Sequence, residues 1–334
     1  MNLSTNYMGM SLRNPFVAGP SPLTEHIETI MPLVDSGIAA VVLPPLFEER
    51  LQDEEMDLFR LIDMPAESFA ESLSFFAEAD RPIVTAKAQI AHVAAVKKRV
   101  DVPVIASISA VNPDRWTEYA ALMEKAGADA LELDFYFVAT DGTEPGEAIE
   151  KRFIDVLRRV KGRVKVPVSV KLTAFHTSLV HFSRSLEAAG ADGLVLLHRF
   201  YEHDIDIENL EPLFQLRPSD SRELLLRLRS LAIISGAVDC SLAASGGVHS
   251  VPDTIKAIMS GADCVQITSS LLQNGSGYIA TLLEGLEAWM ERNEYDSVRQ
   301  MRGSMNIKRI PDPGALSRRH YMHVLSSWPK RHAE

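Results

Sequence analysis

The stretch LEAAGADGLVL, residues 186–196, decides the fold because its pattern recurs three more times along the chain. In each copy a helical pattern stops at a glycine and a short apolar run follows, and in three of the four copies an alanine and an aspartate stand between them. The other copies are LVDSGIAAVVL at 33–43, MEKAGADALEL at 123–133 and IMSGADCVQI at 258–267. A glycine with left-handed dihedrals ends a helix, and a continuous apolar run is typical of a parallel strand covered on both faces. The repetition therefore predicts helices that alternate with parallel strands.

Eight short apolar runs are candidate strands, separated mostly by helical patterns. They are Pro15–Ala18, Ala40–Leu43, Val104–Ser107, Ala130–Leu133, Val168–Lys171, Gly193–Leu196, Cys240–Ala244 and Cys264–Ile267. Eight strands that alternate with helices match a TIM (β/α)8 barrel. We expect a single barrel domain over residues 1–334, with an appended C-terminal segment over about 302–334.

Three connections are longer than a plain barrel needs, namely 44–100, 135–150 and 198–222. Each follows the carboxyl end of a predicted strand, which is the end at which barrel enzymes build their active sites. We therefore expect extended loops at the C-terminal face and a functional site among them. The basic tail from Arg302 is expected to pack as an appended helix or a subunit contact.

The composition is ordinary for a soluble globular enzyme, with 46% hydrophobic residues in 334. The net charge of −11 argues against nucleic acid or an anionic membrane as a partner. No window reaches the apolar length of a membrane span. The two cysteines, Cys240 and Cys264, form neither a metal motif nor a disulfide framework, and they fit thiols of the reducing cytoplasm. We expect a cytoplasmic protein that binds a small molecule and no metal.

Two neighbouring loops carry an anion-binding pattern. Gly246 and Gly247 follow one predicted strand and precede a helix start, and the run Gln266, Thr268, Ser269 follows the next strand. Backbone N–H groups in such turns bind anions, and the loops after strands seven and eight form the common phosphate site of this fold. The alternative is that the glycines only make a tight turn.

Lys171 ends the strand that begins at Val168, so its ammonium is expected at the mouth of the barrel. A buried lysine needs an anion or an electron-rich partner. Three roles are open: stabilising a reduced flavin, forming a Schiff base with a carbonyl substrate, or making a structural ion pair, for which Asp134 is the favoured partner. Ser107 ends another strand and could bond a ring ligand or remain a core hydroxyl.

Other side chains near the expected mouth carry weaker signals. The histidines show no metal-binding spacing and are more consistent with loop or packing roles; they are His176, His198, His203 and His249. Tyr136 and Phe137 could line an aromatic cofactor or simply pack.

Three regions together resemble the dihydroorotate dehydrogenase family of FMN-dependent barrels: NPFVAG at 14–19, PVSVKL at 167–172, and ASGGV through QITSS over 244–270. The similarity covers nearly the whole chain. It implies an FMN-dependent oxidoreductase that acts on CH–CH bonds of dihydroorotate or a related small carbonyl compound, in pyrimidine biosynthesis. The sequence starts directly at the barrel, without the helical membrane-associating extension of the quinone-linked enzymes, and so resembles the soluble class. The family usually forms dimers.

The same resemblance implies which residues hold FMN. In the family, the double-glycine turn and the loop after the last strand hold the phosphate, the lysine at the position of Lys171 lies along the flavin, and the first-strand loop touches the ring. With the neighbouring strand-end residues added, the candidate cofactor-binding residues are Ala18, Gly19, Ser107, Asp134, Lys171, Gly246, Gly247, Gln266, Thr268 and Ser269.

The loop after the fourth strand departs from the family pattern. The family has Asn-x-Ser-Cys-Pro-Asn there and uses the cysteine as base, whereas residues 134–139 read DFYFVA and place Phe137 at the base position. Because phenylalanine cannot take a proton, we name Asp141 as the candidate catalytic base and Thr140 as a hydroxyl alternative, beside Lys171. Asp141 could equally be a solvated turn residue. The family's asparagines after the second strand are also missing from 61–68, so recognition of orotate is weakened.

Two alternatives to the oxidoreductase remain open. One is a flavin- or phosphate-binding barrel that has lost catalysis, and the other is a lyase that uses Lys171 as a Schiff-base nucleophile. The chain lacks the cysteine clusters that hold iron–sulfur centres, so a relay of that kind would need a separate electron-transfer partner.

Overall fold

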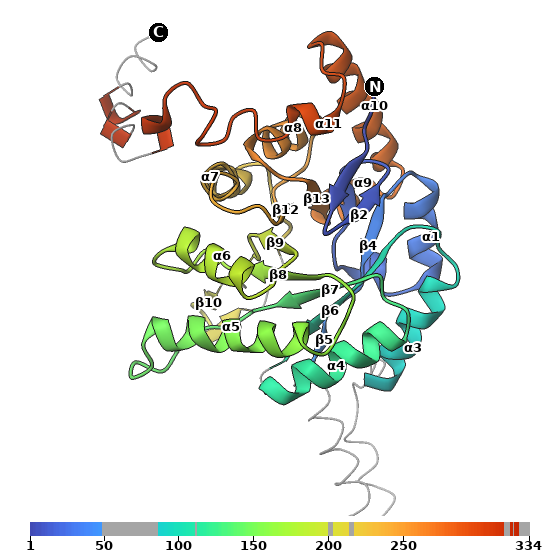
Figure 1. The fold of residues 1–334 in the computed structure, drawn as a ribbon, viewed down its shortest axis with the longest axis vertical. Helices are drawn as coiled ribbons and strands as arrows, with labels where there is room; N and C mark the ends of the chain where they lie inside the picture. Colours follow the sequence, from blue (N-terminus) through green and yellow to red (C-terminus); the bar gives the residue numbers. More distant parts are fainter. Residues whose placement is uncertain are drawn as a thin grey trace, which may run out of the picture.

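The computed structural model describes residues 1–48, 86–110, 112–199, 203–213, 217–316, 321–322 and 324–326. Eight parallel strands form a closed barrel (Figure 1), in which β3 pairs with β13 and β4 pairs with β6 to complete the ring. The strands are β3 (Phe16–Ala18), β4 (Ala40–Val42), β6 (Val104–Ser109), β7 (Ala130–Asp134), β8 (Val168–Leu172), β9 (Gly193–Leu196), β12 (Ser241–Ser245) and β13 (Cys264–Ile267). The predicted TIM barrel is confirmed, and each predicted strand end lies within two residues of the observed one.

Helices surround the barrel on its outside (Figure 1). They are α1 (Ile27–Asp35), α3 (Ala86–Lys97), α4 (Pro113–Lys125), α5 (Gly146–Lys161), α6 (Leu179–Ala188), α7 (Leu224–Ile234), α8 (Val251–Ser260), α9 (Ser269–Asn274), α10 (Tyr278–Arg292) and α11 (Val298–Met301), with short 3-10 turns η1 (Pro22–Thr24) and η3 (Pro313–Leu316). None of these helices combines the length and apolarity that a membrane crossing requires.

The repeated glycines end helices as the sequence predicts. Gly37, Gly127, Gly190 and Gly261 all have φ values between 100° and 125°. Only glycine adopts such a conformation without steric cost, so each helix stops there and the chain turns into the next strand.

The barrel interior changes from apolar to polar along the strand direction. At the amino end, the hairpin of β1 (Thr5–Tyr7) and β2 (Met10–Leu12) packs its Tyr7 and Leu12 side chains against inward-facing apolar residues of the barrel strands. Side chains two residues apart on a strand share a face. The inward face of β7 therefore continues from Ala130 to Glu132, and that of β13 from Cys264 to Gln266. A layer of buried polar side chains follows the apolar layer toward the mouth.

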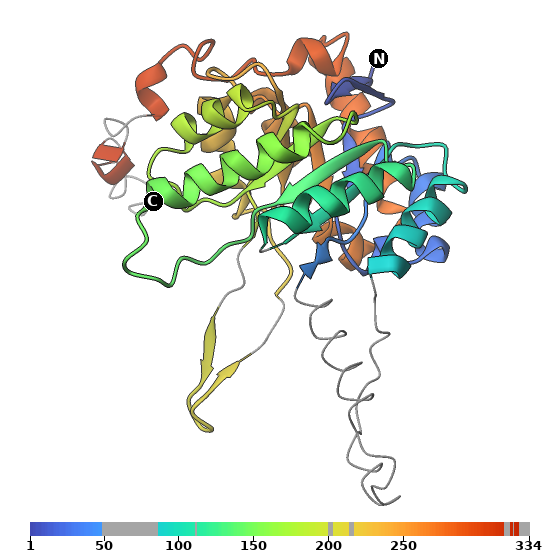
Figure 2. The ribbon, with the colours of Figure 1, turned by 60° about the horizontal axis from the view of Figure 1, so that its bottom comes forward.

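The long connections lie at the carboxyl ends of the strands, although parts of them fall outside the described residues. Residues 49–85, which contain the predicted departure from the family at 61–68, are outside them. The connection after β4 includes β5 (Leu46–Phe47), which pairs with the end of β6. The connection after β9 contains a hairpin of β10 (Asp204–Asp206) and β11 (Glu211–Leu213), which projects away from the barrel (Figure 2).

The start of the C-terminal segment is attached to the helical layer. The N–H groups of Gly303 and Met305 donate to the carbonyls of Ile258 and Met259 at the end of α8, at 2.9 and 2.8 Å.

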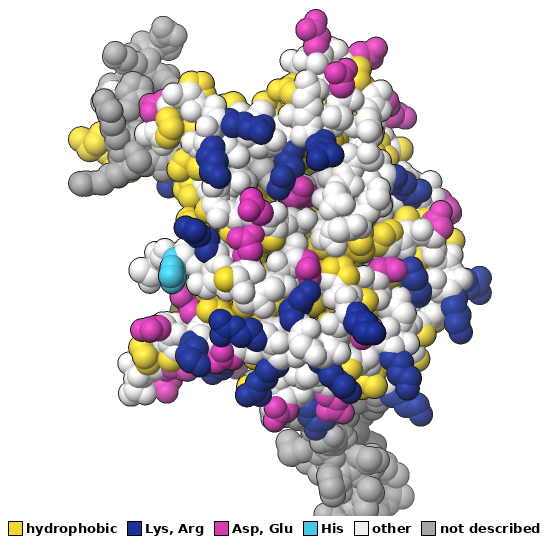
Figure 3. Space-filling view, in the orientation of Figure 1, with side chains coloured by type: hydrophobic (Ala, Val, Ile, Leu, Met, Phe, Trp, Pro, Cys, Tyr) yellow, Lys and Arg dark blue, Asp and Glu magenta, His cyan; other side chains and the backbone are white. Residues whose placement is uncertain are grey.

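On the face shown in Figure 3, Lys and Arg side chains are interspersed with Asp and Glu.

Candidate functional site

A buried ion pair forms the centre of the polar layer. Lys171 on β8 places its Nζ 3.3 Å from Oε1 of Glu132 on β7, and both side chains are almost completely buried. Gln266 on β13 donates from Nε2 to the other oxygen of Glu132 at 2.6 Å. The prediction that Asp134 pairs with Lys171 is therefore wrong: the ion pair is made by Glu132, two residues earlier on the same inward face.

The ammonium of Lys171 is stabilised in its charged form. Burial lowers the pKa of Lys171, but attraction to Glu132 and Asp134 outweighs that effect, so the pKa is raised above its ordinary value. A lysine needs a neutral amine to attack a carbonyl. The arrangement thus favours a fixed positive charge at this position over a Schiff-base nucleophile.

Asp134 instead holds His198, at the mouth of the barrel. The distance from Oδ1 of Asp134 to Nδ1 of His198 is 2.7 Å, and the Asp134 side chain is 2% exposed while that of His198 is 22% exposed. The N–H of His198 donates to the carbonyl of Leu172 at 2.6 Å, which fixes the backbone after β9. The ring of Tyr136 contacts the imidazole edge-on, with centroids 5.0 Å apart. This histidine, which sequence reasoning placed among loop residues, is part of the site.

The two predicted phosphate loops lie together and are joined by Ser219. Its N–H donates to Oγ of Ser269 at 3.0 Å, and its hydroxyl accepts from the N–H of Gly247 at 3.3 Å. The same hydroxyl lies 3.0 Å from Nε2 of His249. The structure therefore brings the glycine turn and the start of α9 into one cluster, and Ser219 is a member that the sequence did not reveal.

The double glycine is required by close packing. Gly246 and Gly247 have φ values of 82° and 79°. A Cβ on Gly246 would lie 2.8 Å from Nη2 of Arg227, and a Cβ on Gly247 would lie 2.5 Å from the backbone nitrogen of Leu224. These contacts bring the beginning of α7 against the turn, which only glycine permits.

Arg227 adds a buried positive charge beside that turn. Its guanidinium donates to the carbonyls of Glu223 at 2.7 Å and Leu197 at 3.2 Å, and also to that of Ser245. Burial lowers the pKa of Arg227, although a guanidinium remains charged. No sequence motif singled out this residue, because two of its partners, the carbonyls of Leu197 and Ser245, lie 30 and 18 residues away in the chain.

The first-strand loop reaches the loop after β13. The N–H of Gly19 donates to the carbonyl of Ile267 at 3.0 Å. A Cβ at Gly19 would lie 2.5 Å from Oγ1 of Thr268, so the glycine leaves room for that side chain. Ala18 ends β3 and is buried beside this contact. The predicted residues of the two loops are thus neighbours at the mouth.

Two buried polar atoms in the polar layer have no protein partner among the described residues. Oγ of Ser107, on β6, and Oε1 of Gln266 each lack a hydrogen bond. Both side chains are about 1% exposed. Buried polar groups are normally hydrogen-bonded, and an unpaired one points to a ligand or water. These two atoms are therefore available to form hydrogen bonds with a polar ring bound at the mouth of the barrel.

The residues predicted as candidate base lie elsewhere. Thr140 and Asp141 are exposed in the loop between β7 and α5. Oδ1 of Asp141 accepts hydrogen bonds from the N–H and the hydroxyl of Thr143, at 2.8 and 2.7 Å, and these bonds lower the pKa of Asp141. No hydrogen bond or ion pair in the described part of the chain connects either residue to Lys171 or His198. Their catalytic role stays a prediction.

The aromatic residues of the same loop pack with one another. Phe135 stacks on Phe153 of α5 with ring centroids 4.4 Å apart, and Phe137 contacts Phe153 edge-on at 6.1 Å. The guanidinium of Arg152 lies 4.9 Å from the centre of the Phe137 ring. The position of the expected base is thus occupied by a packing residue.

Comparison with known proteins places this chain in a family. Residues 81–290 match the sequence model described as dihydroorotate dehydrogenase. A dihydroorotate dehydrogenase B (NAD(+)) catalytic subunit of Thermoplasma volcanium is 26% identical over 328 residues, which cover 92% of this chain and 99% of the relative. The corresponding subunit of Methanothermobacter thermautotrophicus is 30% identical over 210 residues, 61% of this chain and 69% of the relative.

A relative named for a different activity covers the chain equally well. Subunit PreA of the NAD-dependent dihydropyrimidine dehydrogenase of Escherichia coli is 23% identical over 332 residues, which are 93% of this chain and 78% of the relative.

Proposed function

Because the chain belongs to the dihydroorotate dehydrogenase family of oxidoreductases that act on CH–CH bonds, we propose that it is an FMN-dependent enzyme that removes two hydrogens from a small ring of the dihydropyrimidine type. The relatives are named for dihydroorotate and for dihydropyrimidine, and both substrates carry a saturated carbon–carbon bond next to a carbonyl. We take these two compounds as the first candidates, with pyrimidine metabolism as the proposed setting.

The observation that carries the proposal is the fixed charge of Lys171 within the buried polar layer. Its ammonium is held by Glu132 at the barrel mouth. Ser107, whose hydroxyl has no partner among the described residues, is the register partner of Glu132 in the neighbouring strand β6. When bound, FMN would supply a two-electron acceptor that takes a hydride from the substrate. Lys171 would stabilise the negative charge that develops on a reduced ring, because a preorganised charge in a buried site acts strongly.

The geometry of the loops supports phosphate binding at the other end of the cofactor. We assign the phosphate to the turn of Gly246 and Gly247 and to Thr268 and Ser269, whose loops are joined into one cluster. Arg227 adds positive charge beside that turn. Ala18 and Gly19 in the first-strand loop, and Asp134 and Gln266 in the polar layer, complete the proposed cofactor surroundings.

The proposed electron acceptor is a separate partner. The whole chain contains only Cys240 and Cys264, so it cannot hold a four-cysteine iron–sulfur cluster. Burial raises the pKa of Cys240 to about 12, and both thiols are free. The relatives cited above are named as subunits, which supports a partner that reoxidises the flavin. A homodimer and a cytoplasmic location are further parts of this proposal.

The test is anaerobic reduction of the bound flavin. Dihydroorotate and dihydrouracil are added separately to the purified, FMN-saturated protein, and the flavin absorbance is followed in a stopped-flow instrument. We expect one of the two to bleach the flavin in a single turnover. Bound FMN that neither compound reduces would contradict the proposed reaction and favour a barrel that has lost catalysis.

A further inference from the structure

We propose that His198, oriented by Asp134, is the group that takes a proton from the substrate, in place of the base that Phe137 cannot provide. The inference rests on the proposed function and deepens it, since it names how the second hydrogen leaves the substrate. It moves the proton acceptor from the loop after β7 to the loop after β9.

The hydrogen bond between the two side chains sets the tautomer. An ionised carboxylate can only accept hydrogen bonds, so Nδ1 of His198 must carry the hydrogen that is shared with Oδ1 of Asp134 at 2.7 Å. In a neutral imidazole the other nitrogen then carries a lone pair. Nε2 has no hydrogen-bond partner among the described residues, and it is not among their buried unpaired atoms. Nε2 is therefore open to a ligand.

The surroundings of His198 hold the pair in place. Asp134 is almost completely buried at the end of β7, where the ammonium of Lys171 on β8 attracts its charge. Tyr136 packs against the imidazole edge, and the next residue, Arg199, pairs with Glu223 at 3.3 Å. The orienting carboxylate is thus fixed, while the imidazole keeps one exposed side.

The reaction balances with these groups. Nε2 of His198 takes the proton from the carbon next to the substrate carbonyl, and the electron pair of that C–H bond becomes the second bond between the two ring carbons. The neighbouring carbon loses a hydride, which carries two electrons to the cofactor. The imidazolium formed on His198 is stabilised by Asp134 and later returns its proton to water.

Other side chains of the mouth fit this role less well. Asp141 is exposed and bonded to Thr143 in its own turn. Ser109 donates its hydroxyl to the carbonyl of Asp134 at 3.2 Å, and Lys171 holds its proton tightly. A histidine with a carboxylate on one nitrogen, and no partner among the described residues on the other, has the geometry of a general base.

Three single variants test the assignment. His198→Asn removes Nε2, and Asp134→Asn replaces the accepting carboxylate with an amide that can donate to Nδ1. His176→Asn is the matched control, because His176 is also paired through Nδ1 with a carboxylate, Glu150, at 3.2 Å. Each holoprotein is assayed for FMN content, for substrate affinity and for the rate of flavin reduction by dihydroorotate or dihydrouracil.

We expect His198→Asn to slow flavin reduction by about 10² to 10⁴, the usual contribution of a general base, while FMN content and substrate Kd change by no more than a few-fold. The control should reduce its flavin at the rate of the unaltered protein. Flavin reduction at the unaltered rate in His198→Asn would overturn the assignment. A protein that binds no FMN, or FMN that neither compound reduces in the unaltered protein, would instead overturn the proposed function on which the assignment rests.

A readout that needs no turnover tests the orienting role of Asp134. Nitrogen-15 NMR of histidine-labelled protein distinguishes a protonated ring nitrogen from one with a lone pair. We expect hydrogen on Nδ1 and a lone pair on Nε2 of His198, with the Nε2 signal shifting when orotate or uracil is added. In Asp134→Asn the hydrogen should move to Nε2. Hydrogen on Nε2 in the unaltered protein would contradict the proposal.

Discussion

At the scale of single residues, the carboxylate of Glu132 connects three strands of the barrel. One oxygen pairs with Lys171 and the other accepts from Gln266, so β7, β8 and β13 are joined through one buried charge. Removing one partner of a buried pair leaves an uncompensated charge in a medium that solvates it poorly. The proposed flavin site and the stability of the barrel therefore depend on the same group.

This dependence predicts the outcome of Glu132→Gln. The substitution keeps a hydrogen-bonding side chain but leaves the ammonium of Lys171 without its nearest anion, and we expect unfolding to become easier by about 3–5 kcal/mol. Urea denaturation measures the change. Asp155→Asn, which removes an exposed partner of Lys151, is the control and should cost less than about 1 kcal/mol. Equal effects of the two substitutions would contradict the account of Glu132.

At the scale of elements, the aspartates of the recurring glycine pattern connect each turn to the neighbouring strand. Asp129, Asp192 and Asp263 each accept a hydrogen bond from a backbone N–H at the start of the barrel strand that precedes them in the chain, at Val104, Val168 and Leu242 respectively, at 2.7–2.8 Å. Each also pairs with a basic side chain: Lys97, Lys161 or Arg302. The same sequence pattern thus ends a helix through its glycine and holds the start of a strand through its aspartate.

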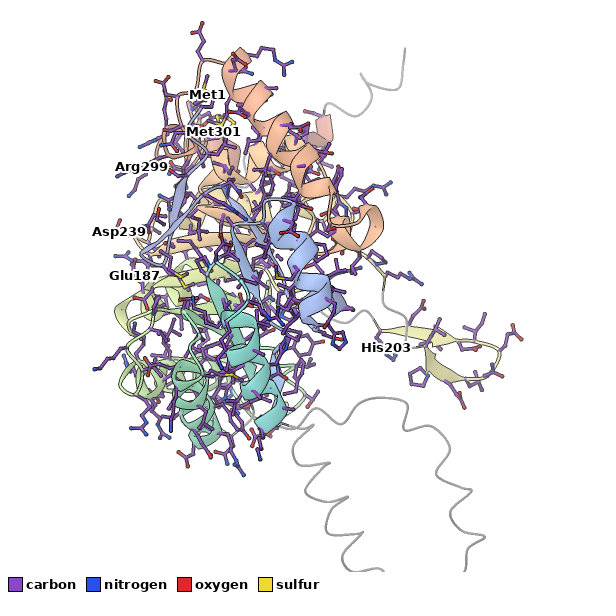
Figure 4. All side chains as sticks on the ribbon, turned by 90° about the vertical axis from the view of Figure 1, so that its right-hand side faces the viewer. Met1, Glu187, His203, Asp239, Arg299 and Met301 are labelled. Atoms are coloured by element: carbon purple, nitrogen blue, oxygen red, sulfur yellow. The ribbon has the colours of Figure 1, made fainter. Side chains whose placement is uncertain are left out.

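A similar contact holds the amino end of β12 and uses the glutamate at the second position of the stretch 186–196. Oε1 of Glu187, at the end of α6, accepts from the N–H groups of Asp239 and Cys240 at 2.6 and 2.7 Å (Figure 4). These contacts lie on the face opposite the proposed site. They stabilise the barrel at the amino ends of its strands, whereas the loops at the carboxyl ends form the proposed site.

Also at this scale, the glycine turn before α8 predicts the result of Gly247→Ala. The new Cβ would meet the backbone of Leu224 at 2.5 Å, whereas Gly275 has a similar φ of 81° and a Cβ added there would have nothing within 4 Å. Both substitutions bear the cost of left-handed backbone, about 1 kcal/mol, but only Gly247→Ala must displace α7. We expect Gly247→Ala to weaken FMN binding at least ten-fold, measured by flavin fluorescence, and Gly275→Ala to leave it unchanged. Equal affinities would show that the turn does not hold the phosphate.

Much of the fold could be predicted from the sequence, because glycine stops and apolar runs are local signals. The positions of Lys171 and Ser107, one and two residues before the carboxyl ends of β8 and β6, were predictable to that precision for the same reason. The role of Glu132 was not, since its partners Lys171 and Gln266 lie on β8 and β13, far along the chain, and only the closed barrel brings them to it. His198 was missed because its significance comes from Asp134, 64 residues earlier, and only the closed barrel brings the two together.

At the scale of the whole molecule, the C-terminal segment stabilises the amino end of the barrel. Nε of Arg302 lies 2.7 Å from Oδ1 of Asp263, at the start of β13. Burial raises the pKa of Asp263 to about 6, although Arg302 acts in the opposite direction. Because the folded protein holds this proton more tightly than the unfolded chain, the ionised carboxylate disfavours the folded state above pH 6, and that cost disappears as the pH falls toward 4.

This pH dependence of the stability gives a prediction for Arg302→Gln. Without the guanidinium the buried carboxylate becomes more costly at pH 8, and we expect a loss of about 1–2 kcal/mol in the free energy of unfolding. At pH 5 Asp263 is mostly protonated in both proteins, so the loss should shrink. Arg299→Gln, which alters an exposed arginine lining the same hollow, should show no such pH dependence. A loss of unfolding free energy that grows toward pH 5 would contradict the stabilising role of Arg302 beside Asp263.

The central claim about the molecule is that the barrel mouth holds FMN. The most direct measurement is the visible spectrum of the purified protein, followed by denaturation and mass analysis of the released chromophore. We predict FMN at about one per chain, either as purified or after incubation with added FMN, because one phosphate cluster and one Lys171 serve one cofactor. A colourless protein that also fails to take up added FMN would contradict the account.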